Sequence, residues 1–394
     1  MRIGINASFI RKPDSGTGQV TKHFINALFS MIESDPEKYA NPEFILYLEE
    51  DINISVPKNV GVKIFLPPYK RDDLIRKIWW EKYLLPKKAA QDGCNVLLSL
   101  YQSATVVKNM KHVMLVHDAA WKCFPQYLNN MRKKIYYGLV DRAIKKASHI
   151  MTVSSFSKKE IEKYFYVENE KITVNYIDCD PIFKEEYSNE TLENILKKHN
   201  LKKGYIFYVG GFDIRKNISR LIDAYAKMWK KYGQTIAIPK LVLAGSFHFH
   251  LIPLITDIPD EIKKAGKKYG LPEKKIEYIN FVEPEDLPLL YRGASLFCYP
   301  SLYEGFGLPV LEAMNSQCPV VSSDASSIPE VTGKETVLLV DPKDSDAICE
   351  AMYNMITDKQ KRGIFTENTK KRAKKFNWNI FVENTFNIIH EITK

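Results

Sequence analysis

The chain has little of what would mark it as a secreted, metal-scaffolded or membrane-spanning protein. Only six of its 394 residues are cysteine, and no two of them form a Cys-x-x-Cys pair. This excludes a disulfide scaffold, a zinc ribbon and a thioredoxin-like redox site. No apolar run reaches the roughly 20 residues that a membrane-spanning helix needs. The first residues alternate like a strand and run into Arg11, Lys12 and Pro13, so we expect no secretion signal and a reducing, cytoplasmic setting.

Acidic residues are also in deficit. Lys and Arg together number 57 against 47 Asp and Glu, which gives a formal net charge of +10. A basic surface attracts phosphates, which nucleotides, anionic lipids and nucleic acids all carry, although lysine-rich surfaces without any such role are as common. Because no nucleic-acid-binding motif is present, we expect no nucleic-acid partner. The 45% hydrophobic content, with 22 Tyr and 20 Phe, is that of a folded protein.

Short strands alternate with amphipathic helices in two successive series. In the first series, residues 17–31 place apolar side chains on one helical face, and strands are expected at 3–7, 44–48, 62–66, 96–100, 113–117 and 150–154. The second series has an apolar helical face from Ile218 to Trp229, and its strands are expected at 205–209, 241–244, 276–279, 296–299, 320–322 and 337–340. This alternation is typical of βαβ units and parallel sheets.

The predicted fold class is therefore α/β, with two doubly wound domains. The polar stretch 189–204 separates the two series, and we expect it to be a linker. The first domain is placed at residues 1–190 and the second at residues 200–377. Ligands of such sheets bind outside the carboxyl ends of the strands, so two sheets predict a site in the cleft between them.

The most informative segment is the strand-to-helix turn at residues 299–312, Tyr-Pro-Ser-Leu-Tyr-Glu-Gly-Phe-Gly-Leu-Pro-Val-Leu-Glu. We expect its helix to begin near Gly307 or Leu308, where free backbone N–H groups and the helix dipole attract a diphosphate. Glu304 and Glu312 flank this helix start, and each carboxylate could bind a vicinal diol of a sugar or a ribose. Spacing alone leaves open whether they act as a paired acid and base, or only as acidic residues at a helix terminus.

A second strand-to-helix turn occurs at residues 210–217, Gly-Gly-Phe-Asp-Ile-Arg-Lys-Asn. Arg215 and Lys216 precede a helix start, where cations oppose the helix dipole. A bound anion would explain this local conflict, and an exposed basic turn is the equal alternative.

The amino-terminal half contains weaker candidates. Gly16 and Gly18 form a Gly-x-Gly turn before a helix, a pattern that many βα turns share. His117 follows a strand and could hydrogen-bond a substrate hydroxyl, with Asp118 orienting its ring. A buried histidine with satisfied hydrogen bonds is the commoner explanation of a lone one.

Two further patterns resemble metal sites but carry no metal prediction. His248 and His250 have the spacing of a ligand pair, yet no third ligand is in view, and we interpret them as loop residues. Asp178-Cys-Asp180 spells a D-x-D motif, which we interpret as coincidence because it precedes the linker. No metal site is therefore expected.

Together these motifs resemble glycosyltransferase family four, the group 1 glycosyltransferases, which are retaining enzymes of the GT-B fold. The likeness covers most of residues 110–342 and is most specific at the two glutamates eight residues apart. The other matching segments are residues 117–118, 153–158, 208–217, 281–292, 319–323, 328–331 and 339–342. The GT-B fold implies two Rossmann-like domains facing across a cleft, and residues 378–394 fit the family's helix that crosses back to the first domain.

The resemblance implies a nucleotide-sugar donor held mainly by the second domain and an acceptor on the side of the first. The implied catalytic residues are Glu304, His117 and Asp118. The implied substrate-binding residues are Gly16, Gly18, Gly210, Gly211, Arg215, Lys216, Phe281, Val282, Gly305, Phe306, Gly307, Leu308 and Glu312. Many family members carry Arg where this chain has Gly211, and Arg215 is the candidate replacement at the diphosphate.

By position, Glu304 and the backbone of Phe306 and Gly307 would hold the sugar. Leu308 N–H, Arg215 and Lys216 would hold the diphosphate, Glu312 the ribose and residues 281–282 the base. The implied reaction is front-face transfer of a hexose with retention, in which the leaving β-phosphate takes the acceptor's proton. Fixed cations and helix N–H groups can stabilise that phosphate, so neither a metal nor a cofactor is expected.

The acceptor and the donor base stay open at this point. A glycan or lipid-linked acceptor in surface polysaccharide or lipopolysaccharide synthesis is the favoured reading. Residues 76–86 are similar to mannosyltransferases, which favours GDP-mannose over a UDP-sugar. The alternatives are a GT-B isomerase or phosphorylase and a non-catalytic glycan-binding member.

Residues 70–88 mix six Lys and Arg side chains after Lys70 with Trp79, Trp80, Tyr83 and Leu84. Basic and aromatic residues together suit an anionic lipid surface, so this segment predicts peripheral attachment to the inner face of the cell membrane. The alternative is an ordinary helix packed on its sheet, with Trp79 or Trp80 buried.

Overall fold

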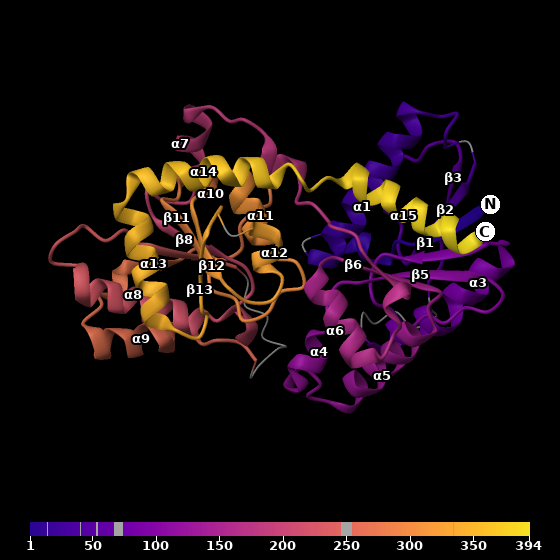
Figure 1. Ribbon diagram of the computed structural model, residues 1–394, viewed down its shortest axis with the longest axis horizontal. Coiled ribbons are helices and arrows are strands. Elements are labelled where there is room, and N and C mark those ends of the chain that lie inside the picture. The colour runs from indigo at the N-terminus through magenta and orange to yellow at the C-terminus, as the bar shows by residue number, and fades with distance from the viewer. Residues whose placement is uncertain (14, 40, 53, 67–73, 246–253, 334) are drawn as a thin grey trace. The chain divides into compact units, whose positions relative to one another are not determined.

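The computed structural model describes the chain except for residues 14, 40, 53, 67–73, 246–253 and 334. The chain divides into two compact units (Figure 1). The first unit comprises Met1–Asp178 and Phe376–Lys394, and the second comprises Cys179–Lys375. The second unit thus begins before the boundary that the sequence suggested near residues 190–200.

The polar stretch 189–204 is not simply a linker. Its first ten residues form helix α7 (Asn189–Lys198), which packs against α10 (Leu287–Gly293) in the second unit. Ser188 accepts a hydrogen bond from Thr191 N and caps the helix, while Leu192 and Leu196 are buried one turn apart. Two leucines at this spacing are enough to dock an otherwise polar helix, because each buried leucine contributes about 1.5–3 kcal/mol.

The first unit is built on a seven-stranded, fully parallel sheet with the order β3-β2-β1-β4-β5-β6-β7. Its strands are β1 (Arg2–Asn6), β2 (Glu43–Leu48), β3 (Val60–Ile64), β4 (Val96–Ser99), β5 (Lys111–Val116), β6 (His149–Thr152) and β7 (Ile172–Val174). The sequence predicts the first six but not β7, because three residues are too few to show an alternation. The strand order reverses between β1 and β4, which makes this edge a switch point.

Helices cover both faces of this sheet. They are α1 (Gly16–Ser34), α2 (Leu74–Trp79), α3 (Leu85–Gln91), α4 (Ala120–Cys123), α5 (Met131–Lys146), α6 (Ser155–Phe165) and α15 (Trp378–Thr393), with the π-helical η2 (Trp80–Leu84) and the 3-10 turns η1 (Ser8–Arg11), η3 (Pro125–Tyr127) and η4 (Asn169–Lys171). The C-terminal helix α15 lies beside α1 (Figure 1). Asn175 Nδ2 donates to Phe381 O at 2.9 Å, which ties α15 to the end of the sheet.

The second unit repeats the architecture with a six-stranded parallel sheet in the order β10-β9-β8-β11-β12-β13. Its strands are β8 (Ile206–Val209), β9 (Leu241–Ala244), β10 (Ile276–Tyr278), β11 (Leu296–Tyr299), β12 (Val320–Ser323) and β13 (Leu338–Val340). All six lie where the sequence predicts them. Here too the order reverses beside the first strand, between β8 and β11.

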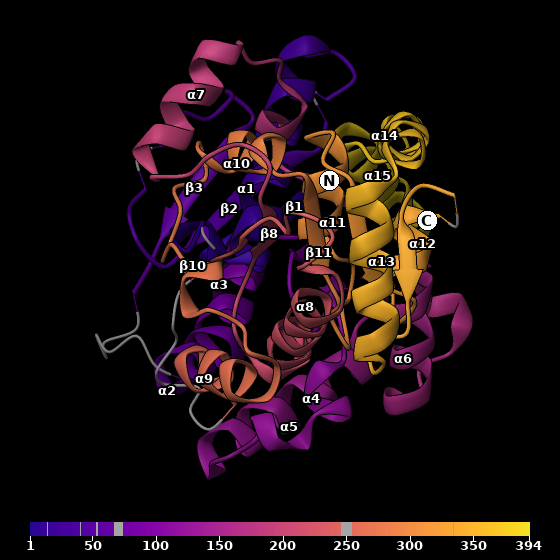
Figure 2. The same ribbon diagram turned by 90° about the vertical axis from the view of Figure 1, so that its left-hand side faces the viewer.

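The helices of the second unit pack around this sheet. Besides α7 and α10 they are α8 (Ile218–Tyr232), α9 (Ile258–Tyr269), α11 (Leu308–Asn315), α12 (Ile328–Thr332), α13 (Ser345–Thr357) and α14 (Lys359–Ala373), with the 3-10 turns η5 (Pro181–Lys184), η6 (Ile214–Lys216) and η8 (Glu273–Lys275). Helices α8 and α13 lie side by side (Figure 2), and the rings of Tyr232 and Tyr353 stack there at 3.7 Å. In the described parts of both units, no helix has the length and apolar character that crossing a membrane requires.

Candidate functional site

The turn between β11 and α11 has the geometry that the sequence predicts. Gly307 caps α11 with φ +100°, a left-handed conformation that favours glycine, and the helix begins at Leu308. A Cβ on Gly307 would lie 2.5 Å from Ile328 Cδ1, so the position also lacks space for a side chain. No side chain caps this helix start. The first N–H groups of α11 are therefore available to a ligand at the carboxyl edge of the sheet.

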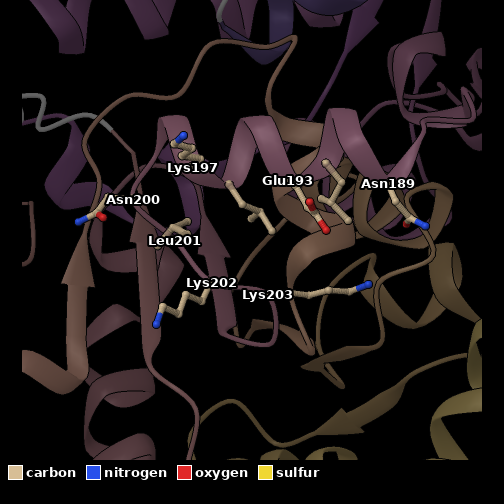
Figure 3. A pocket seen from close by; sticks show the side chains of 9 residues that line it. Asn189, Glu193, Lys197, Asn200, Leu201, Lys202 and Lys203 are labelled. Carbon is tan, nitrogen blue, oxygen red and sulfur yellow. The ribbon is translucent and has the colours of Figure 1, made fainter.

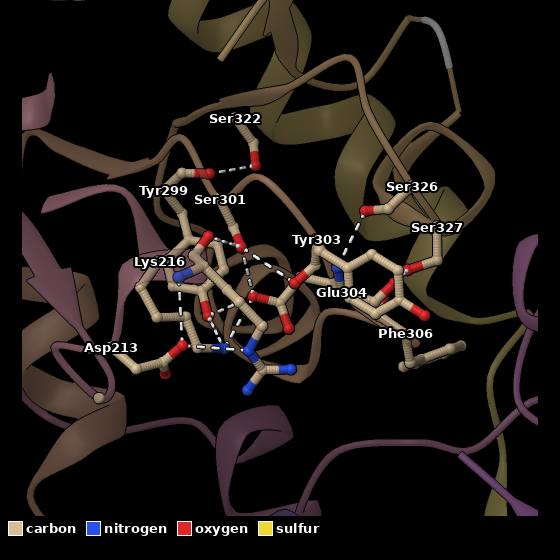
Figure 4. A network of polar contacts seen from close by, with 12 residues as sticks. Asp213, Lys216, Tyr299, Ser301, Tyr303, Glu304, Phe306, Ser322, Ser326 and Ser327 are labelled. Carbon is tan, nitrogen blue, oxygen red and sulfur yellow. Dashed lines mark hydrogen bonds and ion pairs between the residues drawn. The ribbon is translucent and has the colours of Figure 1, made fainter. Parts of the chain in front are cut away.

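Glu304 lies at the centre of a dense polar network in this turn (Figure 4). Its Oε1 accepts hydrogen bonds from Ser301 Oγ at 2.7 Å, Lys216 Nζ at 2.8 Å and Tyr299 OH at 2.9 Å. The backbone is fixed as well, because Glu304 N donates to Ser326 Oγ at 3.0 Å. Three donors on one oxygen hold the carboxylate in a single orientation.

The other oxygen of each site glutamate is open. In the described part of the chain, Glu304 Oε2 takes part in no hydrogen bond, although the side chain is only 10% exposed. Glu312 likewise uses one oxygen, Oε2, which accepts from Tyr291 OH at 3.0 Å. An ionised carboxylate has about four acceptor positions. Both side chains can therefore accept further hydrogen bonds from a hydroxylated ligand.

Glu312 lies inside α11, and its environment changes its acidity. Burial is the largest influence and raises the pKa of the Glu312 carboxyl to about 7, while the hydrogen bond from Tyr291 acts in the opposite direction. The carboxyl therefore changes charge near neutral pH. Sequence reasoning placed Glu312 at the site but gave no sign of this shift, because its cause is the three-dimensional surroundings of the helix.

Both cations of the 210–217 turn have carboxylate partners within the protein. Lys216 Nζ contacts Glu304 Oε1, and its ammonium also donates to Tyr299 OH at 2.7 Å. Arg215 Nε donates to Asp213 Oδ1 at 3.0 Å. The conflict with the helix dipole that the sequence suggested is thus relieved by carboxylates of the protein. Lys216 nevertheless stands directly at the Glu304 carboxylate, within the same cluster as the start of α11.

The glycine turn itself is packed against this cluster. Tyr208 OH donates to Gly211 O at 2.7 Å, and the Tyr208 ring stacks on Tyr299 at 5.6 Å, next to Gly210. The loop between β12 and α12 adds Ser327, whose hydroxyl donates to the carbonyls of Glu304 and Phe306 at 3.0 and 2.9 Å. These contacts fix the turn that also includes Gly305.

Several residues of the network were missed at the level of sequence. Tyr299, Ser301, Ser326 and Ser327 support Glu304, and Tyr291 supports Glu312. Only Ser301 carried a usable signal, because it precedes Glu304 by three residues in the same turn. The remaining predicted donor residues, Phe281 and Val282, follow β10; Phe281 is half-exposed and Val282 is buried.

In the first unit, His117 is held by the backbone and not by Asp118. Its Nε2 lies 3.1 Å from Leu100 O, and a carbonyl can only accept, so Nε2 carries the proton. Burial lowers the pKa of His117, which leaves the ring neutral with Nδ1 as an acceptor. Asp118 Oδ1 instead accepts from Ala120 N at 2.9 Å. The expected orienting role of Asp118 is therefore filled by Leu100 O.

Gly16 and Gly18 open α1 as the sequence predicts, but they differ in their surroundings. Ser15 caps the helix by accepting from Gly18 N at 3.0 Å. A Cβ on Gly18 would lie 1.8 Å from Lys12 O, whereas a Cβ on Gly16 would have nothing within 4 Å. Gly18 is thus required by the close approach of the preceding loop.

A pocket of about 420 Å³ borders α7 in the second unit and is lined by both leucines and lysines (Figure 3). None of the predicted site residues lines it. Among the described residues, no cluster of three or more His, Cys, Asp or Glu side chains could hold a metal ion. Asp180 caps η5 by accepting from Ile182 N. His248 and His250 lie outside the described residues.

Comparisons with known sequences point to one family. A family model described as glycosyl transferases group 1 matches residues 192–372. Over 276 residues the chain is 33% identical to the O-antigen chain mannosyltransferase B of Escherichia coli, covering 70% of this chain and 69% of that protein. It is 30% identical over 242 residues to the O-antigen chain mannosyltransferase RfbU of Salmonella typhimurium, covering 61% and 59%. The serotype-specific mannosyltransferase WbdA of Escherichia coli is longer, and the chain spans 30% of it at 26% identity.

Solved structures share the whole fold at low identity. Sucrose-phosphate synthase from Thermosynechococcus elongatus superposes with a TM-score of 0.73 at 16% identity, covering 100% of this chain and 99% of that one. WaaG, a glycosyltransferase involved in lipopolysaccharide biosynthesis, gives 0.71 at 16%, and Anabaena Alr3699/HepE in complex with UDP and glucose gives 0.70 at 17%, each covering 99% of both chains. The two parallel sheets are thus those of a GT-B fold, and the chain belongs to the group 1 glycosyltransferases.

Proposed function

We propose that this protein is a retaining hexosyltransferase that moves mannose from GDP-mannose to a glycan or lipid-linked acceptor in surface polysaccharide synthesis. The relatives named as O-antigen chain mannosyltransferases support the sugar and the pathway class. The acceptor would be a growing polysaccharide or its lipid-linked precursor. This proposal refines glycosyltransferase activity, which the family membership already gives.

One observation carries the donor assignment: two fixed carboxylates with open oxygens flank an uncapped helix start. Glu304 Oε2 can accept from hydroxyls of the transferred sugar, and Glu312 Oε1 can accept from the hydroxyls of a ribose. The first N–H groups of α11, at Leu308, lie between them in sequence and suit a diphosphate. Sugar, diphosphate and ribose follow one another in a nucleotide-sugar in this same order.

In the proposed reaction the bond from the anomeric carbon to the β-phosphate oxygen breaks, and a bond from the same carbon to the acceptor oxygen forms on the same face. The leaving β-phosphate takes the proton of the acceptor hydroxyl. The protein stabilises the negative charge that develops on this phosphate. Lys216 and the N–H of Leu308 are the groups proposed for that task, with Arg215 assisting, and no metal or cofactor is needed.

His117 has a separate role in this proposal. Its neutral ring presents Nδ1 as an acceptor, because Nε2 is committed to Leu100 O. An acceptor nitrogen suits a hydroxyl of the sugar or of the acceptor molecule. Asp118 contributes by fixing the turn that follows β5, through Ala120 N.

The test is release of free nucleoside diphosphate on mixing the protein with a donor and an acceptor. We expect GDP from GDP-mannose only when a mannose-terminated acceptor is present, and NMR of the product should show the axial anomeric configuration of the donor. Release from UDP-glucose alone among donors would move the assignment to a UDP-sugar transferase. Release without an acceptor, or only with free phosphate, would indicate an isomerase-like or phosphorylase activity. No release, with glycan binding retained, would indicate a non-catalytic member.

A further inference from the structure

A second polar cluster lies at the switch point of the first sheet, and none of its residues has been given a role above. Asn6 ends β1, and Tyr101 follows β4, the strand at which the order reverses. Asn6 Nδ2 donates to Tyr101 OH at 3.0 Å, and both side chains are buried. Carboxyl ends of parallel strands at a switch point are where ligands of doubly wound sheets bind.

Lys77, on α2, directs its ammonium into this cluster. Its Nζ lies 4.6 Å from the ring centre of Phe9, 4.8 Å from that of Tyr136 and 5.1 Å from that of Tyr101. In the described part of the chain it donates no hydrogen bond, and its closest carboxylate oxygen, Glu81 Oε1, is 3.7 Å away. A quarter of the Lys77 side chain remains exposed. An ammonium has three N–H donors, and none of them is used in a hydrogen bond within the described residues.

Glu81 does not need Lys77 for its hydrogen bonds. Its Oε1 accepts from Tyr101 OH at 2.9 Å, and its Oε2 accepts from Ala104 N at 2.7 Å. Tyr136 OH lies 3.3 and 3.2 Å from the two oxygens. This fully buried carboxylate is thus satisfied by neutral donors. A lysine present only to compensate Glu81 would be expected to donate to it directly, as Lys216 does to Glu304.

Several charged side chains of the described residues lie around Lys77. Arg76 Nε lies 3.2 Å from Glu49 and its NH2 3.2 Å from Glu50, and Arg11 lies within 3.8 Å of the same two carboxylates. These four side chains balance one another. The carboxylates of Glu81 and Glu49 favour the charged form of Lys77, and the positive charges of Lys12 and Arg11 disfavour it. Burial is the main cause that lowers the pKa of Lys77. An anion beside the ammonium would favour its charged form and so raise the pKa again.

The loop after β4 carries two buried hydroxyl groups next to the backbone N–H that binds Glu81. Ser103 and Thr105 flank Ala104, the residue whose N–H binds Glu81, and both side chains are fully buried. Their hydroxyl oxygens have no hydrogen-bond partner among the described residues. Buried hydroxyls without partners are uncommon, because each lost hydrogen bond costs on the order of 1 kcal/mol.

We propose that Lys77 binds a phosphate group of the acceptor at this switch point, within the first unit. The proposal rests on the transferase function above and specifies its acceptor as a phosphorylated one. Two sources carry that chemistry: a lipid diphosphate that bears the glycan, and a free sugar phosphate. Phe9 and the two tyrosine rings would shield the ammonium–phosphate contact from water, which strengthens it.

The first experiment measures protection of individual lysines from acetic anhydride by peptide mass spectrometry, on the unaltered full chain. Geranyl diphosphate, mannose 1-phosphate, neutral octyl mannoside and GDP are the four additions. We expect a phosphorylated acceptor analogue to lower acetylation of Lys77 at least about fivefold, while Lys134, exposed on α5 of the same unit, is unaffected. GDP should protect Lys216 without protecting Lys77.

Each outcome decides one point. Protection of Lys77 by geranyl diphosphate alone identifies a lipid source, and protection by mannose 1-phosphate alone identifies a sugar phosphate. Equal protection by octyl mannoside, or no protection by either phosphate, overturns the site. The measurement requires no turnover, so it remains decisive even if no nucleoside diphosphate is released in the assay of the proposed function.

Kinetics provide the second test. Lys77→Met should raise the KM for the phosphorylated acceptor by roughly 10- to 100-fold, as expected for loss of a charge-assisted hydrogen bond, and leave the KM for GDP-mannose unchanged. Lys77→Arg should restore part of the loss, and Lys134→Met is the control. An unchanged acceptor KM in a folded Lys77→Met protein contradicts the proposal. If that variant does not fold, the lysine protection on the unaltered chain decides alone.

Discussion

The carboxyl edges of the two sheets carry opposite chemistry on one architecture. Both sheets are parallel and reverse their order beside the first strand. In the second unit the cations are engaged, and the carboxylates of Glu304 and Glu312 each keep one oxygen open. In the first unit the carboxylate of Glu81 is satisfied, and the ammonium of Lys77 keeps its donors open. The open positions of the second edge are therefore carboxylate oxygens, which suit hydroxyls, and the open position of the first edge is an ammonium, which suits an anion.

This difference shows that the residue types at the carboxyl edge of a sheet do not by themselves determine which ligand binds there. Each edge contains a lysine beside a glutamate: Lys216 with Glu304 at 2.8 Å, and Lys77 with Glu81 at 3.7 Å. What distinguishes them is which partner neighbouring groups satisfy. Tyrosine hydroxyls and a backbone N–H saturate Glu81, whereas at Glu304 all donors converge on one oxygen. The predictions below test whether these open positions are the ones that bind substrate.

The largest effect is expected from Lys216. Lys216→Ala removes the cation beside the start of α11 and leaves Glu304 without its ion pair, so GDP-mannose affinity should fall by about 1.5–3 kcal/mol, or roughly 10- to 100-fold. Isothermal titration with the donor measures it. EDTA should leave turnover of the unaltered protein unchanged.

A matched control is Lys231→Ala, because Lys231 pairs with Glu350 at 2.8 Å on the helical surface of the same unit. We expect that variant to bind the donor normally. Unchanged donor affinity in Lys216→Ala, or loss of turnover with EDTA, would remove the proposed diphosphate role.

Substitutions of Glu304 and Glu312 should change different kinetic parameters. Glu304→Gln should mainly lower kcat, because contacts to the sugar can strengthen as charge develops on its ring. Glu312→Gln should mainly raise the donor KM, because a ribose contact is alike in ground and transition states. Each loss is on the order of 2 kcal/mol, or roughly thirtyfold. Steady-state kinetics separate the two parameters.

Binding of GDP, which lacks the sugar, checks the placement. It should bind Glu304→Gln about as well as the unaltered protein, and both variants should melt near its Tm. If Glu304→Gln loses GDP while Glu312→Gln keeps it, the donor lies in the reverse orientation.

Much of the candidate site in the second unit could be predicted from the sequence, because its residues lie close together in the chain. The helix start at Leu308, the left-handed Gly307 and both glutamates follow from one continuous turn. The strands of the second sheet also lie where alternation placed them. Buried strands and glycine turns have short-range signatures, since they depend on neighbouring residues in the chain.

The rest depended on contacts between distant residues. Lys216 meets Glu304 across 88 positions, and Glu81 meets Tyr136 across 55. Neither partner can be recognised from spacing, so the sequence suggested unpaired cations where an ion pair exists and gave no sign of the Lys77 cluster. Helix α7 was mistaken for a linker because two buried leucines outweigh its polar composition only when α10 is present to cover them.

The two glycines at the start of α1 allow a test of how tightly the loop at the carboxyl edge of the first sheet is packed. Gly18→Ala should lower the free energy of unfolding by about 1–3 kcal/mol, because the new Cβ would meet Lys12 O at 1.8 Å and the loop must shift. Gly16→Ala should be close to neutral, since nothing lies within 4 Å of its Cβ. Thermal unfolding of both variants measures the difference. Equal Tm values would show that the loop from η1 to α1 yields without cost.

The raised pKa of Glu312 predicts a pH dependence of donor binding at the second edge. Because the pKa of Glu312 is raised to about 7, its carboxylate form, which accepts ribose hydroxyls, becomes dominant only above neutral pH. The donor KM should therefore fall as pH rises from about 6 to about 8, by up to roughly tenfold. Glu312→Gln should remove this dependence, and a pH series of donor KM values checks it. A flat profile in the unaltered protein would contradict the assignment.

The same shift affects stability with a defined sign. Folding favours the protonated Glu312, whose ordinary pKa is 4.5. Its contribution to the free energy of unfolding is present below that value and is lost as pH rises through 7. Urea unfolding of Glu312→Gln and of the unaltered protein should thus diverge with rising pH, the variant losing less.

The smallest effect is expected at the membrane. Of the basic residues in segment 70–88, Arg76 binds Glu49 and Glu50, and Lys88 lies 3.8 Å from Asp92, so fewer charges face solvent than the sequence suggested. Trp80 is buried against Phe65. The outward face nevertheless shows large apolar side chains one turn apart: Ile75, Trp79 and Tyr83, exposed by 45%, 46% and 50%.

This face lies on the same helical segment as Lys77, so attachment would bring a lipid-linked phosphate near the first edge. We propose weak binding to anionic vesicles, with exposed Lys82 and Lys87 each adding about 1 kcal/mol, and loss of binding in a Trp79→Ser, Tyr83→Ser double variant. Vesicle sedimentation measures it, with Ile364→Ser, an exposed apolar residue of α14, as the control. Equal sedimentation with neutral and anionic vesicles, or none with either, would show that Ile75, Trp79 and Tyr83 form only the outer surface of a helix. Phosphate binding by Lys77 would then not depend on membrane attachment.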